Sequence, residues 1–420
     1  MSGYGTQLDR FRRSAATLRR RGVRDAARRV VNRLYRRLAV ADLEFPLLEG
    51  DVADWLMVAP PLPAPLLSPT AQATIGWICS PPSPGSGGHT TLFRMVAELE
   101  RQGHTCVLFL YDRHGGDVAA HEQVIRRHWP EMRARVVDVA DGISGVDACV
   151  ASGWPTAHVL AVRAPSTSIR RVYFVQDYEP YFHAKGALST LAEDSYRLGF
   201  RTIALGHMVD GLLRSEIGIS PDVVEFGCDT DVYTLTNTGK RDGVVFYEKP
   251  GNDRRGYTLA KLALEEFHRR NPDQKIHLYG DGGSSWTIPV VRHGRLSPSA
   301  LNELYNSTVA GLGLSFTNVS LVPEEMLAAG NIPVVNELVS ARANLPHPDV
   351  VWARATPSAI ADALTSTVLA PDVAARAAHA ASLVRHGWQP TAERVAEIIL
   401  SEVYGSGWTL AGSEQELVAE

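Results

Sequence analysis

The chain has 420 residues, of which 45% are apolar and 21% charged, with a formal net charge of −4. This is enough for two ordinary soluble domains. No window holds eighteen consecutive apolar residues and the start Met-Ser-Gly-Tyr-Gly lacks an apolar leader region, so we expect neither a transmembrane helix nor a signal peptide. The four cysteines have no paired spacing, which argues against a zinc cluster and predicts reduced, mostly buried thiols in a cytoplasmic protein: Cys79, Cys106, Cys149 and Cys228.

Positive charge is concentrated at the start of the chain. Residues 1–40 hold twelve Arg and only two acids, a net charge of +10, so the rest of the chain carries −14. Apolar residues form a broken helical stripe among the arginines. One interpretation is a helix on an anionic membrane surface. A second is a solvated helix packed on the protein body, and nucleic-acid binding is disfavoured because no nucleic-acid module accompanies the arginines.

Residues 41–73 are rich in Pro, Leu and Ala and predict a partly extended connector, so residues 1–73 form a basic helical extension with a Pro-rich link. Alternating strand and helix signals then predict a first α/β half over 74–236. Its strands are expected at 74–79, 105–111, 146–151, 170–175 and 201–205, and its helices at 88–102, 118–127, 155–163 and 188–198.

A glycine-rich turn follows the first strand. Gly85, Gly87 and Gly88 let a backbone approach a ligand closely, and a turn of this kind between a strand and a helix often holds phosphate. Such turns also serve only to pack a helix on a sheet. The dinucleotide fingerprint Gly-x-Gly-x-x-Gly is absent, which disfavours a dehydrogenase.

Polar residues end the strand that begins near Val172. Gln176, Asp177 and Glu179 follow four apolar residues and are expected at the carboxyl-terminal lip of the sheet. Asp177 either orients a ligand hydroxyl or caps the loop in an Asx turn. Gln176 cannot act as a titrating base.

The second half, 237–385, repeats the layout of the first, and a helix at 390–403 lies in a C-terminal segment, 386–420. Strands are expected at 243–247, 275–279, 290–293, 308–314 and 332–336, and helices at 256–270, 298–305, 323–329 and 357–368. Two such halves that face each other would form a cleft lined by strand ends.

The segment from Leu314 to Val335 is the most informative. It predicts a buried strand, a polar turn, a short helix and another buried strand, with Pro323 at the first helical position and Gly330 just past the helix end. The turn from Thr317 to Ser320 would offer free N–H groups to phosphate. Glu325, one turn into the helix, is placed to bind a sugar hydroxyl such as that of a ribose, or it only favours the helix dipole.

This segment resembles the donor-binding motif of family-4 retaining glycosyltransferases, which have the GT-B fold. Glu325 matches the second Glu of the family motif, whereas Thr317 stands where the family has its first Glu. The tail of the motif is matched by Gly330, Pro333, Val334 and Val335. The run Ser-Phe-Thr-Asn-x-Ser-x-Val-Pro-x-Glu-Met is similar to a narrower branch, the WsaF-like rhamnosyltransferases, which use dTDP-L-rhamnose. The resemblance covers about residues 75–395.

The resemblance implies roles for the residues named above. The catalytic set would be Lys249 and Arg255, which meet the donor diphosphate, together with Asp177 beside the transferred sugar and Glu325. Other donor-binding positions would be Gly87, Gly88, Arg254 (the alternative to Arg255), Tyr279, His293, Gly294, Arg295, Thr317, Asn318, Val319, Ser320 and Leu321. Acceptor-binding positions would be His89, Thr90, Gln176, Asp177 and Glu179.

Several of these positions also have plain structural interpretations: His89 as a helix cap, 253–255 as a solvated turn, and 278–283 and 291–298 as ordinary strand ends. The resemblance implies a retaining transferase that needs no metal or cofactor, with a nucleotide-sugar donor and a glycan or lipid-linked acceptor. The alternatives are a sugar phosphorylase or epimerase on the same fold, and an inactive sugar-nucleotide-binding subunit, which the departures at Thr317 and Gln176 keep open.

Overall fold

In a computed structural model, the described residues are 45–405 except 166, 281, 284, 320, 385 and 386. The chain divides into two units after Gly50, and the second unit, from Asp51 onward, contains both sheets. The basic segment 1–40, predicted to be helical, lies outside the described residues. Within the described part, no helix is both long enough and apolar enough to cross a membrane.

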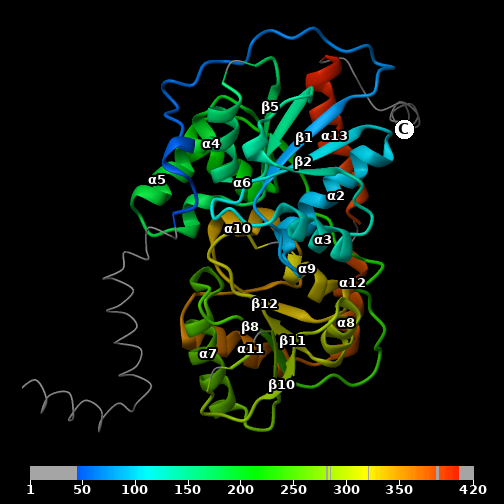
Figure 1. Cartoon of the computed structure of the whole chain (residues 1–420). Coiled ribbons are helices and arrows are strands. Elements are labelled where there is room, and N and C mark those ends of the chain that lie inside the picture. The colour runs from blue at the N-terminus through cyan, green and yellow to red at the C-terminus, as the bar shows by residue number, and fades with distance from the viewer. Residues whose placement is uncertain are drawn as a thin grey trace, which may run out of the picture. The chain divides into compact units, whose positions relative to one another are not determined.

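The first sheet has seven parallel strands in the order β3-β2-β1-β4-β5-β6-β7 (Figure 1). Its strands are β1 (Thr74–Cys79), β2 (Thr105–Leu110), β3 (Arg135–Asp138), β4 (Ala148–Ala151), β5 (Arg170–Val175), β6 (Arg201–Leu205) and β7 (Asp222–Val224). Its helices are α2 (Gly87–Arg101), α3 (Val118–His128), α4 (Trp154–Arg163), α5 (Ala187–Asp194) and α6 (His207–Leu212).

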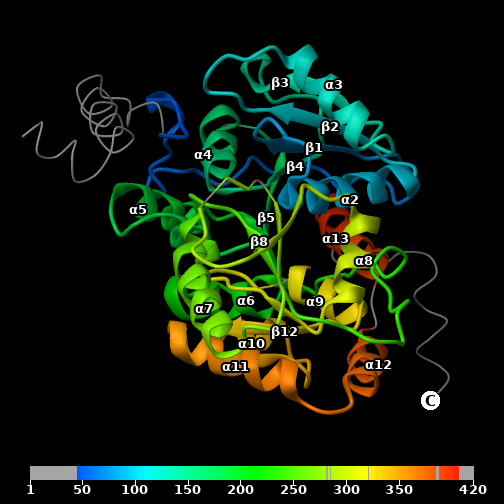
Figure 2. The ribbon, with the colours of Figure 1, turned by 90° about the horizontal axis from the view of Figure 1, so that it is seen from below.

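The second sheet has six parallel strands in the order β10-β9-β8-β11-β12-β13. Its strands are β8 (Val244–Glu248), β9 (Ile276–Gly280), β10 (Val291–Gly294), β11 (Ala310–Leu312), β12 (Ile332–Asn336) and β13 (Val351–Ala353). The helices are α7 (Tyr257–Arg270), α8 (Pro298–Ser307), α9 (Leu321–Ala328), α10 (Val339–Asn344), α11 (Pro357–Leu369) and α12 (Val373–Leu383), and α7 and α11 lie side by side (Figure 2).

The predicted α/β architecture with two Rossmann-like sheets is confirmed. All strands of both sheets are buried on both faces except at the edges, which is why their apolar runs were readable in the sequence. Three edge strands were not predicted: β3, β7 and β13 have only three or four residues each and are partly exposed. The four cysteines are free and buried, as predicted.

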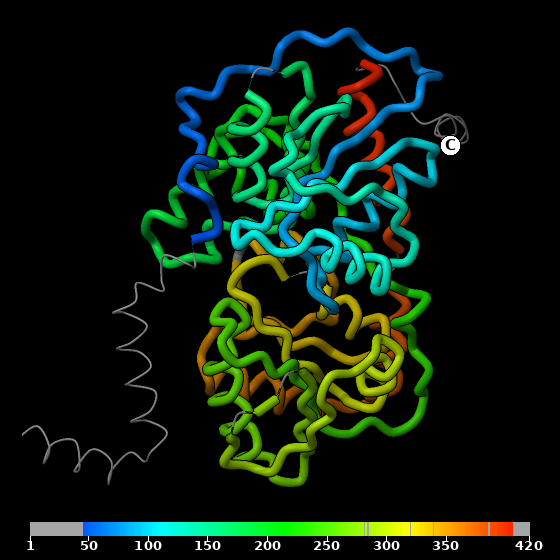
Figure 3. The backbone as a smooth tube through the Cα atoms, viewed as in Figure 1, coloured from blue at the N-terminus to red at the C-terminus, as the bar shows by residue number. Residues whose placement is uncertain are grey.

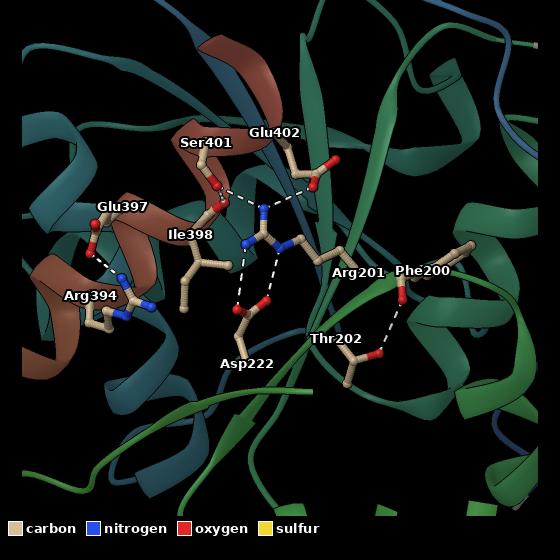
Figure 4. Close-up of polar contacts among 9 residues, drawn as sticks. All are labelled: Phe200, Arg201, Thr202, Asp222, Arg394, Glu397, Ile398, Ser401 and Glu402. Carbon is tan, nitrogen blue, oxygen red and sulfur yellow. Dashed lines mark hydrogen bonds and ion pairs between the residues drawn. The ribbon is translucent and has the colours of Figure 1, made fainter. Parts of the chain in front are cut away.

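The chain passes from the first half to the second after β7 and returns ahead of α13 (Gln389–Tyr404) (Figure 3). Helix α13 belongs to the core of the first sheet, where Trp388, Val395, Ile399 and Val403 pack with β1 and α2 residues. Arg201, at the start of β6, holds the end of this helix (Figure 4). Its guanidinium donates to Asp222 Oδ2 at 2.9 Å, Ser401 Oγ at 2.7 Å and Glu402 Oε1 at 2.8 Å.

Arg201 and Arg394 are both shown in Figure 4, and their contacts predict that replacing them lowers the stability of the fold by different amounts. Arg201→Met removes one cation from between two carboxylates and should lower the free energy of unfolding by about 2 kcal/mol. Arg394 pairs with Glu397 on the exposed side of α13, and half of its own side chain is in solvent. Arg394→Met should therefore change stability by less than about 0.5 kcal/mol. Urea unfolding of both variants measures this, and equal losses would contradict it.

Candidate functional site

The order of the strands determines where each sheet can hold a ligand. In a parallel sheet a ligand binds outside the carboxyl ends of the strands, where the strand order reverses. That point lies between β1 and β4 in the first sheet and between β8 and β11 in the second. The predicted site residues follow these strands or their neighbours: Gly87 and Gly88 after β1; Gln176, Asp177 and Glu179 after β5; Lys249, Arg254 and Arg255 after β8; and Thr317 and Asn318 after β11.

Asp177 follows β5 of the first sheet, and its side chain contacts residues that follow β8 and β11 of the second. Its Oδ1 accepts the backbone N–H of Asn318 at 3.1 Å, and its Oδ2 lies 3.6 Å from Arg254 Nη1. The side chain is 13% exposed. Burial raises the pKa of Asp177, and Arg254, the Thr317 hydroxyl, Arg255 and the Asn318 N–H offset part of that increase. The carboxyl is thus held by partners from the opposite half.

Arg254 is occupied by the first half rather than free in its loop. Besides its ion pair with Asp177, its guanidinium carbon lies 4.1 Å from the ring centroid of Phe182, in the 3₁₀ turn Glu179–Phe182. Arg255 Nη1 donates to Ser315 Oγ at 3.0 Å. Lys249 is exposed in the turn after β8. Arg255 and Lys249 are therefore the predicted diphosphate-binding cations that have no ion pair to the first half among the described residues.

Hydrogen bonds to buried amides fix the turn after β11. Ser315 N–H donates to Asn336 Oδ1 at 2.7 Å, and Asn336 Nδ2 donates back to Ser315 O at 2.8 Å. Ser315 Oγ donates to Asn318 O at 3.1 Å while it accepts from Arg255. Asn336, the last residue of β12, therefore fixes Ser315, and Ser315 in turn holds the Arg255 guanidinium.

Asn318 extends this network into the first half. Its Nδ2 donates to Gln176 O at 3.0 Å, and its Oδ1 accepts from the Asn344 amide. Asn344 Oδ1 in turn accepts the N–H of Met208, at the start of α6, at 2.6 Å. The Asn318 N–H, predicted to be free for phosphate, is thus engaged with Asp177, and its side chain connects the two halves.

The other predicted donor-binding residues that the structure describes in this turn are buried or lie close to the glycine turn that follows β1. The Thr317 and Val319 side chains are buried, and Ser320 lies outside the described residues. Leu321, half-buried, begins α9 and approaches the start of α2, where a Cβ added at Gly87 would lie 3.7 Å from Leu321 Cδ1. Gln176 Nε2 donates to Gly88 O at 3.1 Å. The glycine turn therefore lies against residues that follow β5 and β11.

His89 and Thr90 are engaged within the first half. His89 Nε2 lies 3.0 Å from Ser80 O and must donate there, so Nδ1 accepts from Ser86 Oγ at 2.8 Å. Burial lowers the pKa of His89, which keeps the ring neutral. Thr90 Oγ1 donates to Ser86 O at 3.0 Å and accepts from Trp129 Nε1 at 3.1 Å. Both residues order the glycine turn.

Glu179 binds the start of α4. It accepts the N–H of Trp154, the first residue of that helix, and its own N–H donates to Tyr196 Oη at 3.0 Å. Burial raises the pKa of Glu179 to about 7, and the nearby Asp177 adds to the effect. Near neutral pH this carboxyl therefore titrates next to Asp177.

The start of α9 differs from the prediction. The helix begins at Leu321, so Pro323 is its third residue rather than its first. Proline is tolerated there because the first four N–H groups of a helix have no acceptor within it. Gly330 has φ +72°, as expected of the residue that ends this segment. Without a Cβ it also leaves room for Arg241 and Ala377, which an added Cβ would meet at 2.8 and 2.9 Å.

Glu325 interacts electrostatically with Asp229 and with Arg94 of α2, a cation that the sequence did not single out. Arg94 Nη2 lies 2.9 and 2.6 Å from the two carboxylate oxygens of Asp229. Burial raises the pKa of Glu325 to about 7, Asp229 raises it further, and Arg94 opposes them. Burial, Glu225 and Glu325 raise the pKa of Glu324 to about 8.

The predicted nucleobase residues follow β9 and β10. Tyr279 is buried, its hydroxyl lies 2.8 Å from Tyr305 Oη, and its ring stacks on Tyr247 at 5.0 Å. His293 Nε2 lies 2.9 Å from His277 Nδ1 in a stacked pair. Gly294, with φ +66°, and the exposed Arg295 lie at the end of β10, the edge strand.

Comparisons with known proteins agree with this architecture. Residues 242–365 match the model of the WsaF C-terminal domain. The O-antigen biosynthesis protein RfbC of Myxococcus xanthus is 29% identical over 343 residues, which are 75% of this chain but 26% of RfbC. The chain thus spans about a quarter of that relative's length.

Solved structures show the same fold at low identity. Sucrose-phosphate synthase of Thermosynechococcus elongatus superposes with a TM-score of 0.59 at 12% identity, over 78% of this chain and 98% of that one. HepE of Anabaena, solved in complex with UDP-glucose, gives 0.58 at 13% identity, over 80% of this chain and 100% of that one. The two parallel α/β sheets of this chain have the GT-B fold of glycosyltransferases.

Proposed function

We propose that the chain is a retaining glycosyltransferase of the family-4 type that transfers L-rhamnose from dTDP-L-rhamnose to a glycan or a lipid-linked saccharide. The observation that carries the proposal is the placement of Arg255: its guanidinium is held by Ser315 at the carboxyl ends of β8 and β11, beside Asp177 from the other half. The WsaF match supports the donor because it includes Lys249, Arg255 and Glu325. The name of RfbC supports a polysaccharide product.

The proposed reaction proceeds on one face of the sugar. The bond between C1 and the diphosphate oxygen breaks with its electron pair, and the negative charge that develops on the diphosphate is stabilised by Lys249 and Arg255. The acceptor hydroxyl oxygen forms the new bond to C1 on the same face. Its proton passes to a phosphate oxygen of the leaving group, since Gln176 cannot take it and His89 is engaged at both ring nitrogens.

Asp177, Glu179 and Glu325 take supporting roles in this scheme. Asp177 lies between the halves, where it can accept a hydrogen bond from a sugar or acceptor hydroxyl in addition to that from Asn318. Glu325 follows the start of α9 and would accept a hydrogen bond from the sugar of the nucleotide. Glu179 holds the start of α4 beside the proposed acceptor.

The donor can be identified by thermal shift with common sugar nucleotides. We expect dTDP-L-rhamnose to raise Tm, because a ligand that binds only the folded state stabilises it by mass action. UDP- and GDP-sugars should have smaller effects at equal concentration. If UDP-glucose raises Tm more than dTDP-L-rhamnose does, the donor is not dTDP-L-rhamnose. If no sugar nucleotide raises Tm, the proposed glycosyltransferase activity is itself contradicted.

The two cations can be tested together. Lys249→Ala with Arg255→Ala should lower kcat at least ~100-fold, the scale for lost transition-state charge stabilisation. Arg269→Ala, on the exposed side of α7, is a matched control that should keep the wild-type rate, since 70% of its side chain is in solvent. Wild-type turnover in the double variant would refute the assignment. Donor binding without transfer in the wild-type protein, across an acceptor panel, would instead favour an inactive binding subunit.

We also propose that the amino-terminal part of the chain binds an anionic membrane surface on the cytoplasmic side. Residues 1–40 supply twelve Arg. Shortly after them, Trp55, Leu56 and Met57 form a turn with exposed fractions of 38%, 71% and 79%. Asp54 closes this turn, accepting the N–H of Leu56 and that of Met57. Basic residues and exposed apolar side chains each favour binding to an anionic bilayer.

Flotation with vesicles that contain anionic lipid tests the membrane proposal. The full chain should float, deletion of residues 1–40 should abolish flotation, and Leu56→Ser with Met57→Ser should reduce it severalfold. Leu369→Ser, at a residue 65% exposed at the end of α11, is the matched control and should float like the wild type. Equal flotation of the full and truncated chains would exclude the arginines as the membrane contact.

A further inference from the structure

Arg254 reaches from the second half to the first through two kinds of contact. Its Nη1 lies 3.6 Å from Asp177 Oδ2, and its guanidinium carbon lies 4.1 Å from the ring centroid of Phe182. The Arg254 side chain is 33% exposed, so both contacts are partly removed from water. A planar guanidinium can pair with a carboxylate and stack on an aromatic face at the same time, which the compact ammonium group of lysine does less well.

The two residues that Arg254 contacts bracket the segment that follows β5. Asp177 lies near its start, and Phe182 is the last residue of the 3₁₀ turn Glu179–Phe182. Asp177 and Glu179 are two of the residues to which the resemblance gives acceptor-binding roles. Arg254 therefore holds both ends of the proposed acceptor segment from the opposite half.

The second half fixes the backbone of Arg254. The residue lies in the 3₁₀ turn Asp253–Arg255, and its carbonyl oxygen accepts the N–H of Phe316 at 2.9 Å. Gly256, which follows the turn, has φ +61°, and a Cβ added there would lie 2.9 Å from Phe316 Cε2. Glycine permits both the dihedral angle and the close approach. The Arg254 side chain thus extends from a defined point beside the turn that follows β11.

The neighbouring arginine has a different partner. Arg255 Nη1 donates to Ser315 Oγ, in the second half, at 3.0 Å. Ser315 is itself hydrogen-bonded through its backbone to Asn336, the last residue of β12. Of these two adjacent cations, Arg254 contacts the first half, whereas Arg255 is held within the second, where the proposed function has it bind the diphosphate.

We propose that Arg254 is a positioning residue for the acceptor, which holds residues 177–182 against the second half and does not bind the donor diphosphate. This rests on the proposed function, in which that segment contains acceptor-binding residues. The N–O distance to Asp177 exceeds that of a hydrogen bond, so this ion pair supplies attraction with little directional preference. The ring of Phe182 supplies the direction, because the guanidinium lies over its face.

The two adjacent arginines can be compared in the full chain with dTDP as the ligand. In calorimetric titration, Arg255→Met should weaken dTDP binding at least about tenfold, because a charged hydrogen bond to phosphate is lost. Arg254→Met should keep the affinity within about twofold of wild type. Hydrogen exchange of the peptide that covers residues 177–183 should show the reverse. Arg254→Met should speed it about tenfold, and Arg255→Met should leave it unchanged.

Further variants separate the two contacts of Arg254. Arg254→Lys keeps the charge without the planar group and should restore only part of the protection from exchange. Phe182→Leu should speed exchange by itself and add little to Arg254→Met, because both changes remove the same contact.

Arg342→Met is the matched control. Arg342 Nη2 donates to Glu337 Oε1 at 3.1 Å, and its guanidinium carbon lies 4.8 Å from the ring centroid of Trp352. It therefore makes the same two kinds of contact within the second half. Its replacement should change neither the dTDP affinity nor the exchange of residues 177–183.

Steady-state transfer from dTDP-L-rhamnose to octyl glucoside and octyl rhamnoside gives a kinetic measure. Arg254→Met should raise KM for the acceptor about tenfold and keep KM for the donor within about twofold. An unchanged KM for the acceptor would contradict a positioning role. If neither glycoside accepts the sugar, the exchange measurement decides alone.

The outcomes distinguish this inference from the function on which it rests. If Arg254→Met weakens dTDP binding as much as Arg255→Met does, Arg254 is a diphosphate ligand and the proposal is wrong. Unchanged exchange of residues 177–183 in Arg254→Met would also overturn it. If the wild-type protein binds neither dTDP nor UDP, the proposed function fails, whereas the exchange measurement still shows whether Arg254 holds the segment.

Discussion

A single buried carboxylate, that of Asp177, joins the two halves of this protein at the ends of their strands. A carboxylate removed from water is destabilised by several kcal/mol unless charged or hydrogen-bonding partners replace the solvent. Here the partners come from across the junction: the Asn318 N–H at 3.1 Å and the Arg254 guanidinium at 3.6 Å. Asp177 belongs to the first half and these partners belong to the second, so the buried carboxylate is stable only when the two halves are in contact.

The polar contacts that extend from Asp177 are mostly between neutral groups. Asn336 fixes Ser315, Ser315 holds both Asn318 and Arg255, and Asn318 reaches Asn344 on the way to α6. A connected network of this kind specifies one geometry, because each buried amide that lost its partner would cost about 1–3 kcal/mol. Arg255 inherits its position from this network, which makes it better placed than Arg254 to meet a phosphate.

Sequence patterns located most of the fold because the relevant forces are local. Strands β1, β5, β6 and β12 match their predicted ranges, since buried parallel strands are continuous apolar runs. The helix before Gly330 was found, but its start was placed two residues late, because proline preference points to the first position while the structure tolerates it at the third. Short edge strands and the alanine-rich α12 carry too weak a pattern to be recognised.

The polar part of the site was less predictable because it depends on pairs distant in sequence. Arg94 and Asp229 are 135 residues apart, and nothing around Arg94 distinguishes it from another helical arginine. Its partner, Asp229, lies in the segment between β7 and β8, where the chain passes from the first half to the second. Similarly, a free N–H at Asn318 was a sound expectation for a helix start, but the Asp177 carboxylate that accepts it comes from 141 residues away.

A carboxylate at position 317, where the motif that this segment resembles has its first Glu, would be disfavoured in this setting. The Thr317 side chain is buried next to Asn318, whose N–H binds the Asp177 carboxylate, so a glutamate there would place a second negative charge near one already removed from water. Charge is thus divided between the halves: Asp177 and Glu179 follow β5, and Lys249, Arg254 and Arg255 follow β8. With Arg254 paired to Asp177, Arg255 and Lys249 are the cations after β8 that have no ion pair to the first half among the described residues. A neutral residue at 317 therefore leaves the two acids after β5 opposite three cations after β8, one of them paired with Asp177, and this excess of positive charge favours an anionic ligand.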